Sequence, residues 1–130
     1  MNYAGAYPAP SSVILLAENE PTFSHFAQVM LAGLGYEVIG AKSGAEAVAI
    51  YSHLKDQVDL VLLDTLMPGP SGAQTVTALR TIKPGVKVLL CGNCRSDKDV
   101  DTLLGQGCRG FIQKPYNFDQ LASQVSAAVS

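Results

Sequence analysis

Short apolar runs alternate along this chain with longer segments in which apolar residues recur every three or four positions. A short run without polar alternation is typical of a strand buried on both faces of a sheet, and the longer spacing is typical of a helix that buries one side. The pattern therefore predicts strands at 13–17, 36–40, 60–63, 86–90 and 110–113, each followed by a helix.

Each expected helix has a residue suited to its start: Pro21, Ser43, Ser71, Ser96 and Asn117. Ser43 with Glu46, and Ser71 with Gln74, have the spacing of a capping box. Gly35, Lys83-Pro84-Gly85 and Gly107 are expected to end helices. The helical spacing places the following residues on buried faces: Phe23, Phe26, Ala27, Met30, Leu31 and Leu34; Ala47, Val48, Tyr51 and Leu54; Val76, Leu79 and Ile82; Val100, Leu103 and Leu104; Phe118, Leu121, Val125 and Ala128.

Regular alternation of buried strands and amphipathic helices predicts an α/β fold, because right-handed crossovers place helices on both faces of a parallel sheet. Five units suit a doubly wound five-stranded sheet in the flavodoxin-like order 2-1-3-4-5. One domain is expected over residues 13–130. Residues 1–12, which are rich in Gly, Pro, Ala and Ser, are expected to form a flexible N-terminal tail.

Composition narrows the functional classes. The net charge is −2 and the basic residues are scattered, so nucleic acid is not an expected partner. No apolar run is long enough to cross a bilayer and the start lacks the features of a secretory signal, so neither a membrane nor secretion is expected. Three cysteines in a domain of this size favour reduced thiols. We therefore expect a cytoplasmic protein.

The chemistry is expected where the strands end. Asp64 directly follows the most apolar strand, and Glu18 and Asn19 follow the first strand, which the predicted order places beside it. The ends of the fourth and fifth strands contribute Cys91 and Lys114. Oxygen ligands without histidine suit Mg²⁺, which commonly binds together with a phosphate. Asp64 could then accept a phosphoryl group, with the Lys114 ammonium offsetting its charge.

Three segments, VILLAENEP, LVLLDTLMPGPSG and GFIQKPYNFDQL, resemble motifs of the response-regulator receiver domain of two-component signalling, and the resemblance covers Val13 to Val129. It implies that Asp64 is the phosphoacceptor and that Lys114, joined to Pro115 by a cis peptide bond, contacts the phosphoryl group. It also implies that Mg²⁺ is held by Glu18, Asn19, Asp64 and the backbone carbonyl of Leu66. Phe111 matches the aromatic switch residue, and Cys91 occupies the position of a second switch residue that contacts the phosphoryl group.

Two residues depart from the family pattern. Asn19 stands where the family usually has a second aspartate, and the missing charge predicts weak Mg²⁺ binding. Cys91 stands where the family has threonine or serine, and a thiol is a poorer hydrogen-bond donor than a hydroxyl. We therefore expect phosphorylation to shift the domain less completely into its active conformation.

The resemblance implies a non-enzymatic signalling module that receives a phosphoryl group from a histidine kinase or a histidine phosphotransfer protein. It would signal through the surface of its fourth helix, fifth strand and fifth helix. A second hypothesis is a degenerate receiver that binds partners without phosphorylation. A third is a thiol redox switch through Cys91 and Cys94, which have redox-pair spacing. The sequence leaves open the kinase, the output partner, the oligomeric state and whether the domain is free-standing or part of a larger protein.

Overall fold

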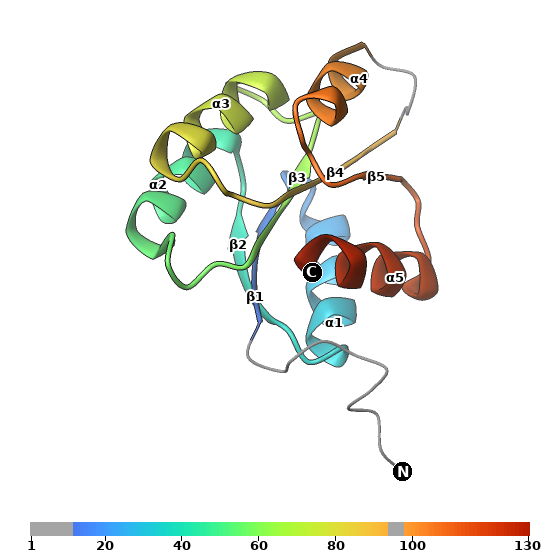
Figure 1. Ribbon diagram of the computed structural model, residues 1–130. Coiled ribbons are helices and arrows are strands. Elements are labelled where there is room, and N and C mark those ends of the chain that lie inside the picture. The colour runs from blue at the N-terminus through green and yellow to red at the C-terminus, as the bar shows by residue number, and fades with distance from the viewer. Residues whose placement is uncertain (1–11, 94–97) are drawn as a thin grey trace.

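The computed structural model describes residues 12–93 and 98–130, and strands and helices alternate throughout these ranges (Figure 1). The elements are β1 (Val13–Ala17), α1 (Pro21–Gly33), β2 (Glu37–Ala41), α2 (Gly44–Leu54), β3 (Leu60–Asp64), α3 (Gly72–Ile82), β4 (Val88–Gly92), α4 (Lys98–Gly105), β5 (Phe111–Gln113) and α5 (Phe118–Val129). The predicted α/β alternation is confirmed. The tail predicted at 1–12 lies outside the described residues except for Ser12, which is buried and whose carbonyl accepts a hydrogen bond from the Glu37 amide.

All strand pairs of the sheet are parallel, and the strand order is β2-β1-β3-β4-β5. The predicted flavodoxin-like order is thus confirmed. In this order β1 and β3 are neighbours, with Ala17 paired to Leu63, and β3 is paired to β4 through Asp64 and Cys91. Consequently the carboxyl ends of strands that are far apart in sequence meet at one edge of the sheet.

Two hydrophobic cores lie on opposite faces of the sheet, and Figure 1 shows α1 and α5 together on one side and α2 and α3 on the other. Neighbouring residues of β3 alternate between the cores: Leu60 and Leu62 pack toward α1 and α5, whereas Val61 and Leu63 pack toward α2, α3 and α4. This period of two explains why β3 is apolar at every position up to Asp64.

Most of the predicted helix starts are confirmed. Ser71 and Gln74 form a reciprocal capping box at α3, and Asn117 caps α5 in the same way with Gln120. The capping box expected at α2 is incomplete: Ser43 accepts from the Glu46 amide, but the Glu46 carboxylate accepts from the backbone of Lys42 instead of that of Ser43. The cap expected at Ser96 lies outside the described residues.

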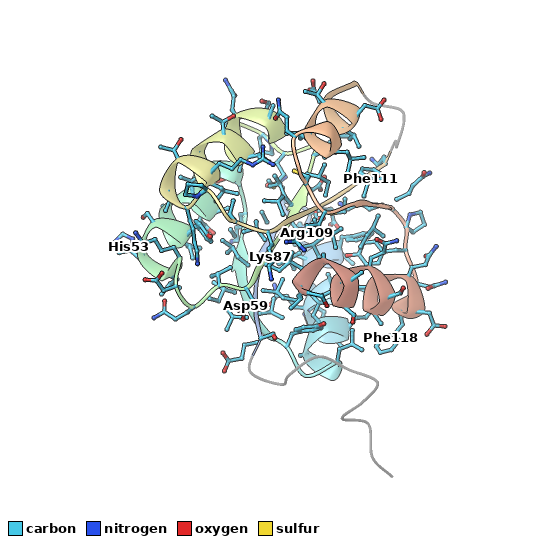
Figure 2. The ribbon with its side chains drawn as sticks, viewed as in Figure 1. His53, Asp59, Lys87, Arg109, Phe111 and Phe118 are labelled. Atoms are coloured by element: carbon cyan, nitrogen blue, oxygen red, sulfur yellow. The ribbon has the colours of Figure 1, made fainter. Side chains whose placement is uncertain are left out.

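The structure corrects two of the predicted buried positions. Phe26 is 55% exposed on α1, because Ala27, Met30 and Leu31 already fill the face of this helix toward the sheet. Phe118 is 42% exposed at the start of α5, where it directly follows the capping residue (Figure 2).

The limits of four strands differ by one or two residues from those predicted. β2 begins at Glu37, β4 at Val88 and β5 at Phe111, and β3 extends to Asp64. The turn before β4 is closed by a hydrogen bond from the Val86 amide to the Lys83 carbonyl. In the part of the chain that the structure describes, no helix is both long and apolar enough to cross a membrane.

Candidate functional site

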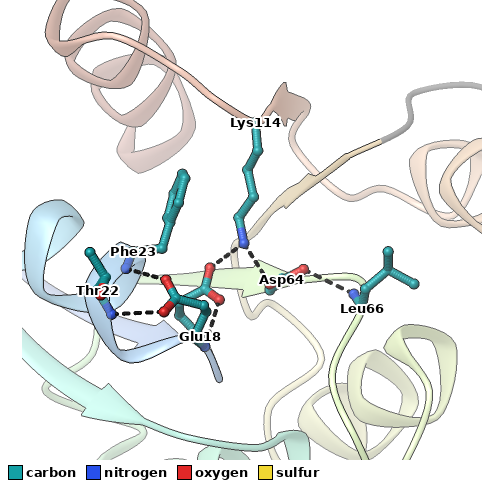
Figure 3. Close-up of polar contacts among 7 residues, drawn as sticks. Glu18, Thr22, Phe23, Asp64, Leu66 and Lys114 are labelled. Atoms are coloured by element: carbon teal, nitrogen blue, oxygen red, sulfur yellow. Dashed lines mark hydrogen bonds and ion pairs between the residues drawn. The ribbon is translucent and has the colours of Figure 1, made fainter.

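A buried ion-pair cluster joins the carboxyl ends of three strands (Figure 3). Glu18 follows β1, Asp64 is the last residue of β3, and Lys114 follows β5. The Lys114 Nζ lies 2.5 Å from the Glu18 Oε1 and 2.7 Å from the Asp64 Oδ2. One ammonium group is therefore shared by two carboxylates that are far apart in the sequence.

Strand geometry explains why these side chains meet. Ala17 and Leu63 both pack toward α2 and α3, so the residue after each of them points to the opposite face, beneath α1 and α5. Glu18 and Asp64 are only 3% and 5% exposed. Burial of two carboxylates is tolerated when each has charged and polar partners.

Backbone amides complete the hydrogen bonding of both carboxylates. The Glu18 Oε2 accepts from the Glu20 amide at 3.1 Å, and the Asp64 Oδ1 accepts from the Leu66 amide at 2.9 Å. Each carboxylate thus has one oxygen on the backbone and the other on Lys114 (Figure 3). This arrangement holds both groups at defined positions before any ligand arrives.

The ionisation of the cluster reflects burial and pairing. Burial raises the pKa of Glu18 above its ordinary value, although the hydrogen bond from Lys114 acts in the opposite direction. Burial alone would lower the pKa of Lys114, but its hydrogen bonds to Asp64 and Glu18 outweigh burial, and the pKa is raised. Lys114 is therefore a permanent cation at neutral pH.

A cavity of about 350 Å³ opens beside Asp64, and it is lined by Glu20, Phe23, Asp64, Leu66, Asn93, Lys114 and Pro115. Leu66 contributes an apolar side chain that is 62% exposed. The cavity therefore gives Asp64 an opening toward solvent, and the charged groups of Glu20 and Lys114 line this opening.

Asn19 behaves differently from its neighbour Glu18. Its side chain is exposed, and the acidic residue of this loop that lines the cavity is Glu20. Glu20 also caps α1, since its carboxylate accepts from the amides of Thr22 and Phe23 at 3.1 and 2.6 Å (Figure 3). Glu20 therefore stabilises the start of α1, where a negative charge interacts favourably with the helix dipole.

The sequence reasoning missed an aromatic pair beside the ion-pair cluster. The Lys114 Nζ lies 4.3 Å from the centre of the Phe23 ring, and Phe23 meets Tyr116 edge to face at 5.2 Å. The signal for Phe23 was its place in the first turn of α1, but its apolar spacing pointed only to the core. The Lys114-Pro115 peptide bond between these groups is cis, as the resemblance implies.

Cys91 lies next to Asp64 in the sheet register and packs in the core beneath α1 and α5. It is 1% exposed, and burial, reinforced by the negative charge of Asp64, raises the pKa of its thiol far above the ordinary value. A reactive redox cysteine needs a lowered thiol pKa, so this environment disfavours the redox hypothesis. Its predicted partner, Cys94, lies outside the described residues.

The Phe111 ring lies beside the end of β4. A Cβ atom added to Gly92 would come within 3.5 Å of this ring and 2.5 Å from the Thr65 Oγ1, so only glycine fits there without rearrangement. Phe111 itself is half-buried and lines a cavity of about 360 Å³ between β5 and α5. Phe111 therefore contacts the end of β4, which lies beside the site, and also reaches the surface.

The donor groups fit a hard cation. Glu18 and Asp64 converge on one cationic group, and their ligand atoms are oxygens, which Mg²⁺ prefers. The described residues contain no cluster of three or more His, Cys, Asp or Glu side chains able to hold a metal ion. A metal here would depend on two carboxylates, backbone or amide oxygens and water, which is the ligand set that Mg²⁺ commonly accepts.

Comparison with known proteins places this geometry in context. A family model for the response regulator receiver domain matches residues 14–126. The sensor kinase CckA of Brucella abortus is 32% identical over 115 residues, which are 88% of this chain but only 12% of the kinase. The chain thus spans about an eighth of the length of that relative.

Two solved structures show the same fold. A response regulator receiver domain protein from Clostridium thermocellum is 23% identical, with a TM-score of 0.85 over 91% of this chain and 94% of that one. The receiver domain of the sensor histidine kinase PA1611 from Pseudomonas aeruginosa is 22% identical, with a TM-score of 0.81 over 92% of this chain and 98% of that one. The latter structure contains a magnesium ion coordinated in its active-site cleft.

Proposed function

The chain belongs to the response regulator receiver domain family, and from this premise we propose that it accepts a phosphoryl group on Asp64. The donor would be a histidine kinase or a histidine phosphotransfer protein, the partner class of receiver domains. The observation that carries the proposal is the shared ion pair, in which Lys114 contacts Asp64 while Glu18 lies on its other side. In this cluster Asp64 also lines a cavity that is open to solvent.

The transfer itself would be a displacement at phosphorus. An oxygen of Asp64 would form a bond to the phosphorus while the bond from phosphorus to the donor nitrogen breaks, and the donor imidazole keeps the electron pair and takes up a proton. The Lys114 ammonium would stabilise the negative charge on the phosphoryl oxygens. The Leu66 amide, already bonded to Asp64, would hold the acceptor group in place.

The resident cation in this proposal would be Mg²⁺, which Glu18, Asp64, the Asn19 amide oxygen and the Leu66 carbonyl would hold. When bound, the ion supplies positive charge to the phosphoryl oxygens. The side chain of Asn19 is exposed and uncharged, which supports the expectation that this binding is weak.

The conformational change caused by phosphorylation would be transmitted from the site through β4 and β5. Cys91 pairs with Asp64 in the sheet, Gly92 packs against the Phe111 ring, and Phe111 reaches the cavity between β5 and α5. We propose that the surface of α4, β5 and α5 carries the signal, with Phe111 and Cys91 as its switch residues.

In this role the domain is a stoichiometric acceptor and not an enzyme with a separate substrate. The two described cysteines, Cys91 and Cys108, are both free thiols, in keeping with a reducing cytoplasm. The curated relatives are longer proteins, so the proposal concerns the receiver unit and not the output of any whole relative.

Phosphorylation of Asp64 is tested by incubating the protein with Mg²⁺ and acetyl phosphate and measuring its intact mass. We expect the wild type to gain one phosphoryl group and Asp64→Asn to gain none, because the amide is not a nucleophile for this transfer. Asp56→Asn, an identical change at an exposed position, should behave as the wild type. Equal gain in Asp64→Asn would contradict the proposal, and no gain in any protein would favour the phosphorylation-independent interaction module.

Cys91→Thr is expected to strengthen the conformational response. A hydroxyl that donates to a phosphoryl oxygen contributes about 1.5 kcal/mol, which corresponds to a roughly tenfold shift of the equilibrium toward the active conformer. On addition of beryllofluoride, the amide NMR shifts of β4, β5 and the start of α5 should therefore change more in Cys91→Thr than in the wild type. Cys108→Thr, the same change in the opposite core, should leave the response as it was, and an unchanged response in Cys91→Thr would rule the account out.

A further inference from the structure

Phe23 is the aromatic residue against which the Lys114 side chain rests. The Lys114 ammonium lies 4.3 Å from the ring centre, inside the distance at which the face of an aromatic ring attracts a cation. In Figure 3 the Phe23 ring stands alongside the end of the Lys114 side chain, on the α1 side of the cluster. Phe23 also lines the cavity beside Asp64.

The ring is itself held in place. Its partner Tyr116 is 5% exposed and meets it at an interplanar angle of 84°, the edge-to-face arrangement that aromatic pairs prefer. Phe23 is partly buried and packs against the core beneath α1 and α5. The Phe23 ring therefore presents a fixed surface to a lysine that would otherwise have four rotatable bonds.

We propose that Phe23 is a positioning residue that holds the Lys114 ammonium over the acceptor site. This inference rests on the proposed function for its consequence, but the contact itself is a separate property of the chain. Before phosphorylation Lys114 is shared by Glu18 and Asp64. When an Asp64 oxygen becomes bonded to phosphorus, the ion pair with that carboxylate is lost, and the ring face keeps the ammonium at the rim where the phosphoryl oxygens arrive.

The test compares three variants on one helix. Phe23→Leu removes the aromatic face but keeps an apolar side chain, Phe23→Tyr keeps the face, and Phe26→Leu makes the same replacement at an exposed position of α1. A partly desolvated cation–π contact predicts a roughly three- to tenfold lower rate constant of phosphorylation by acetyl phosphate for Phe23→Leu. Phe23→Tyr and Phe26→Leu are expected to keep the wild-type rate constant.

A second readout does not depend on phosphorylation. Protons above the face of an aromatic ring resonate upfield, so the ε-methylene protons of Lys114 should lie upfield of those of the other lysines in the wild type and in Phe23→Tyr. In Phe23→Leu they should return to the ordinary lysine position, while Phe26→Leu leaves them upfield. A merely structural role of Phe23 in the core would not move these signals in this pattern.

The two readouts separate the possible failures. Upfield Lys114 signals together with the loss of rate in Phe23→Leu support the inference. An ordinary position of the Lys114 signals in the wild type, or an unchanged rate in Phe23→Leu when the wild type is phosphorylated, overturns it. If the wild type is not phosphorylated at all, the proposed function fails, and the NMR signals alone decide whether Phe23 positions Lys114.

Discussion

Replacing Lys114 by methionine is expected to lower the free energy of unfolding at pH 7 by about 3–5 kcal/mol, the loss typical of removing one partner of a buried ion pair. Methionine matches the lysine side chain as far as Cε but leaves the Glu18 and Asp64 carboxylates without their shared cation. Both carboxylates are almost fully buried, so water reaching Asp64 through the cavity replaces the ammonium only in part. Chemical denaturation with urea at constant pH measures the loss.

The pH dependence of this loss has a defined sign. Burial already raises the pKa of folded Glu18 above 4.5, and removing Lys114 takes away the hydrogen bond that opposes this rise. Between the unfolded and the raised folded pKa the native state binds more protons, so stability falls as pH rises through that window. The deficit of Lys114→Met relative to the wild type should therefore shrink when urea unfolding is repeated at pH 5.

Two further variants make the stability prediction specific. Lys42→Met removes an exposed lysine and is expected to change the unfolding free energy by less than about 0.5 kcal/mol. Adding Glu18→Gln to Lys114→Met removes one of the two unpaired charges and should restore part of the loss at pH 7. A Lys114→Met protein as stable as the wild type at pH 7 would show that the ion-pair cluster does not exist in solution.

The parts of the site that the sequence predicted are those that depend on short-range patterns and one topological rule. Asp64 ends an apolar run and Lys114 directly follows a strand, and the strand order brings the ends of neighbouring strands together without any detail of side-chain packing. Glu18 was found for the same reason, because β1 lies next to β3. Strand ends therefore carry information that survives an error of one or two residues in the strand limits.

The parts that were missed depend on how helices rotate against the sheet. Phe23 and Phe26 have equivalent places in the apolar pattern of α1, yet Phe23 reaches Lys114 and Tyr116 whereas Phe26 is exposed. The partners of Phe23 lie more than ninety positions later in the sequence, so no local pattern distinguishes Phe23 from Phe26. The choice of Glu20 over Asn19 as the cavity-lining residue is likewise decided by the hydrogen bonds of a single turn.

Asn19→Asp is expected to increase the affinity for Mg²⁺ by about 30-fold. A divalent ion and one added carboxylate charge 4 Å apart attract each other by about 2 kcal/mol even at the dielectric constant of water, and 1.4 kcal/mol corresponds to a factor of ten. The value for water is appropriate because position 19 is exposed. Titration of the wild type and the variant with MgCl₂ at constant ionic strength, followed by tyrosine fluorescence or amide NMR shifts, gives both dissociation constants.

A matched control separates a ligand at position 19 from a general effect of charge. Gln57→Glu makes the same change from amide to carboxylate in the exposed turn before β3, at the opposite end of that strand from Asp64, and should leave the dissociation constant unchanged. If Asn19→Asp and Gln57→Glu bind Mg²⁺ as weakly as the wild type, the residue at position 19 does not face the metal. The weak binding of Mg²⁺ would then be explained by the Lys114 ammonium, which lies between the two carboxylates that a metal ion would need.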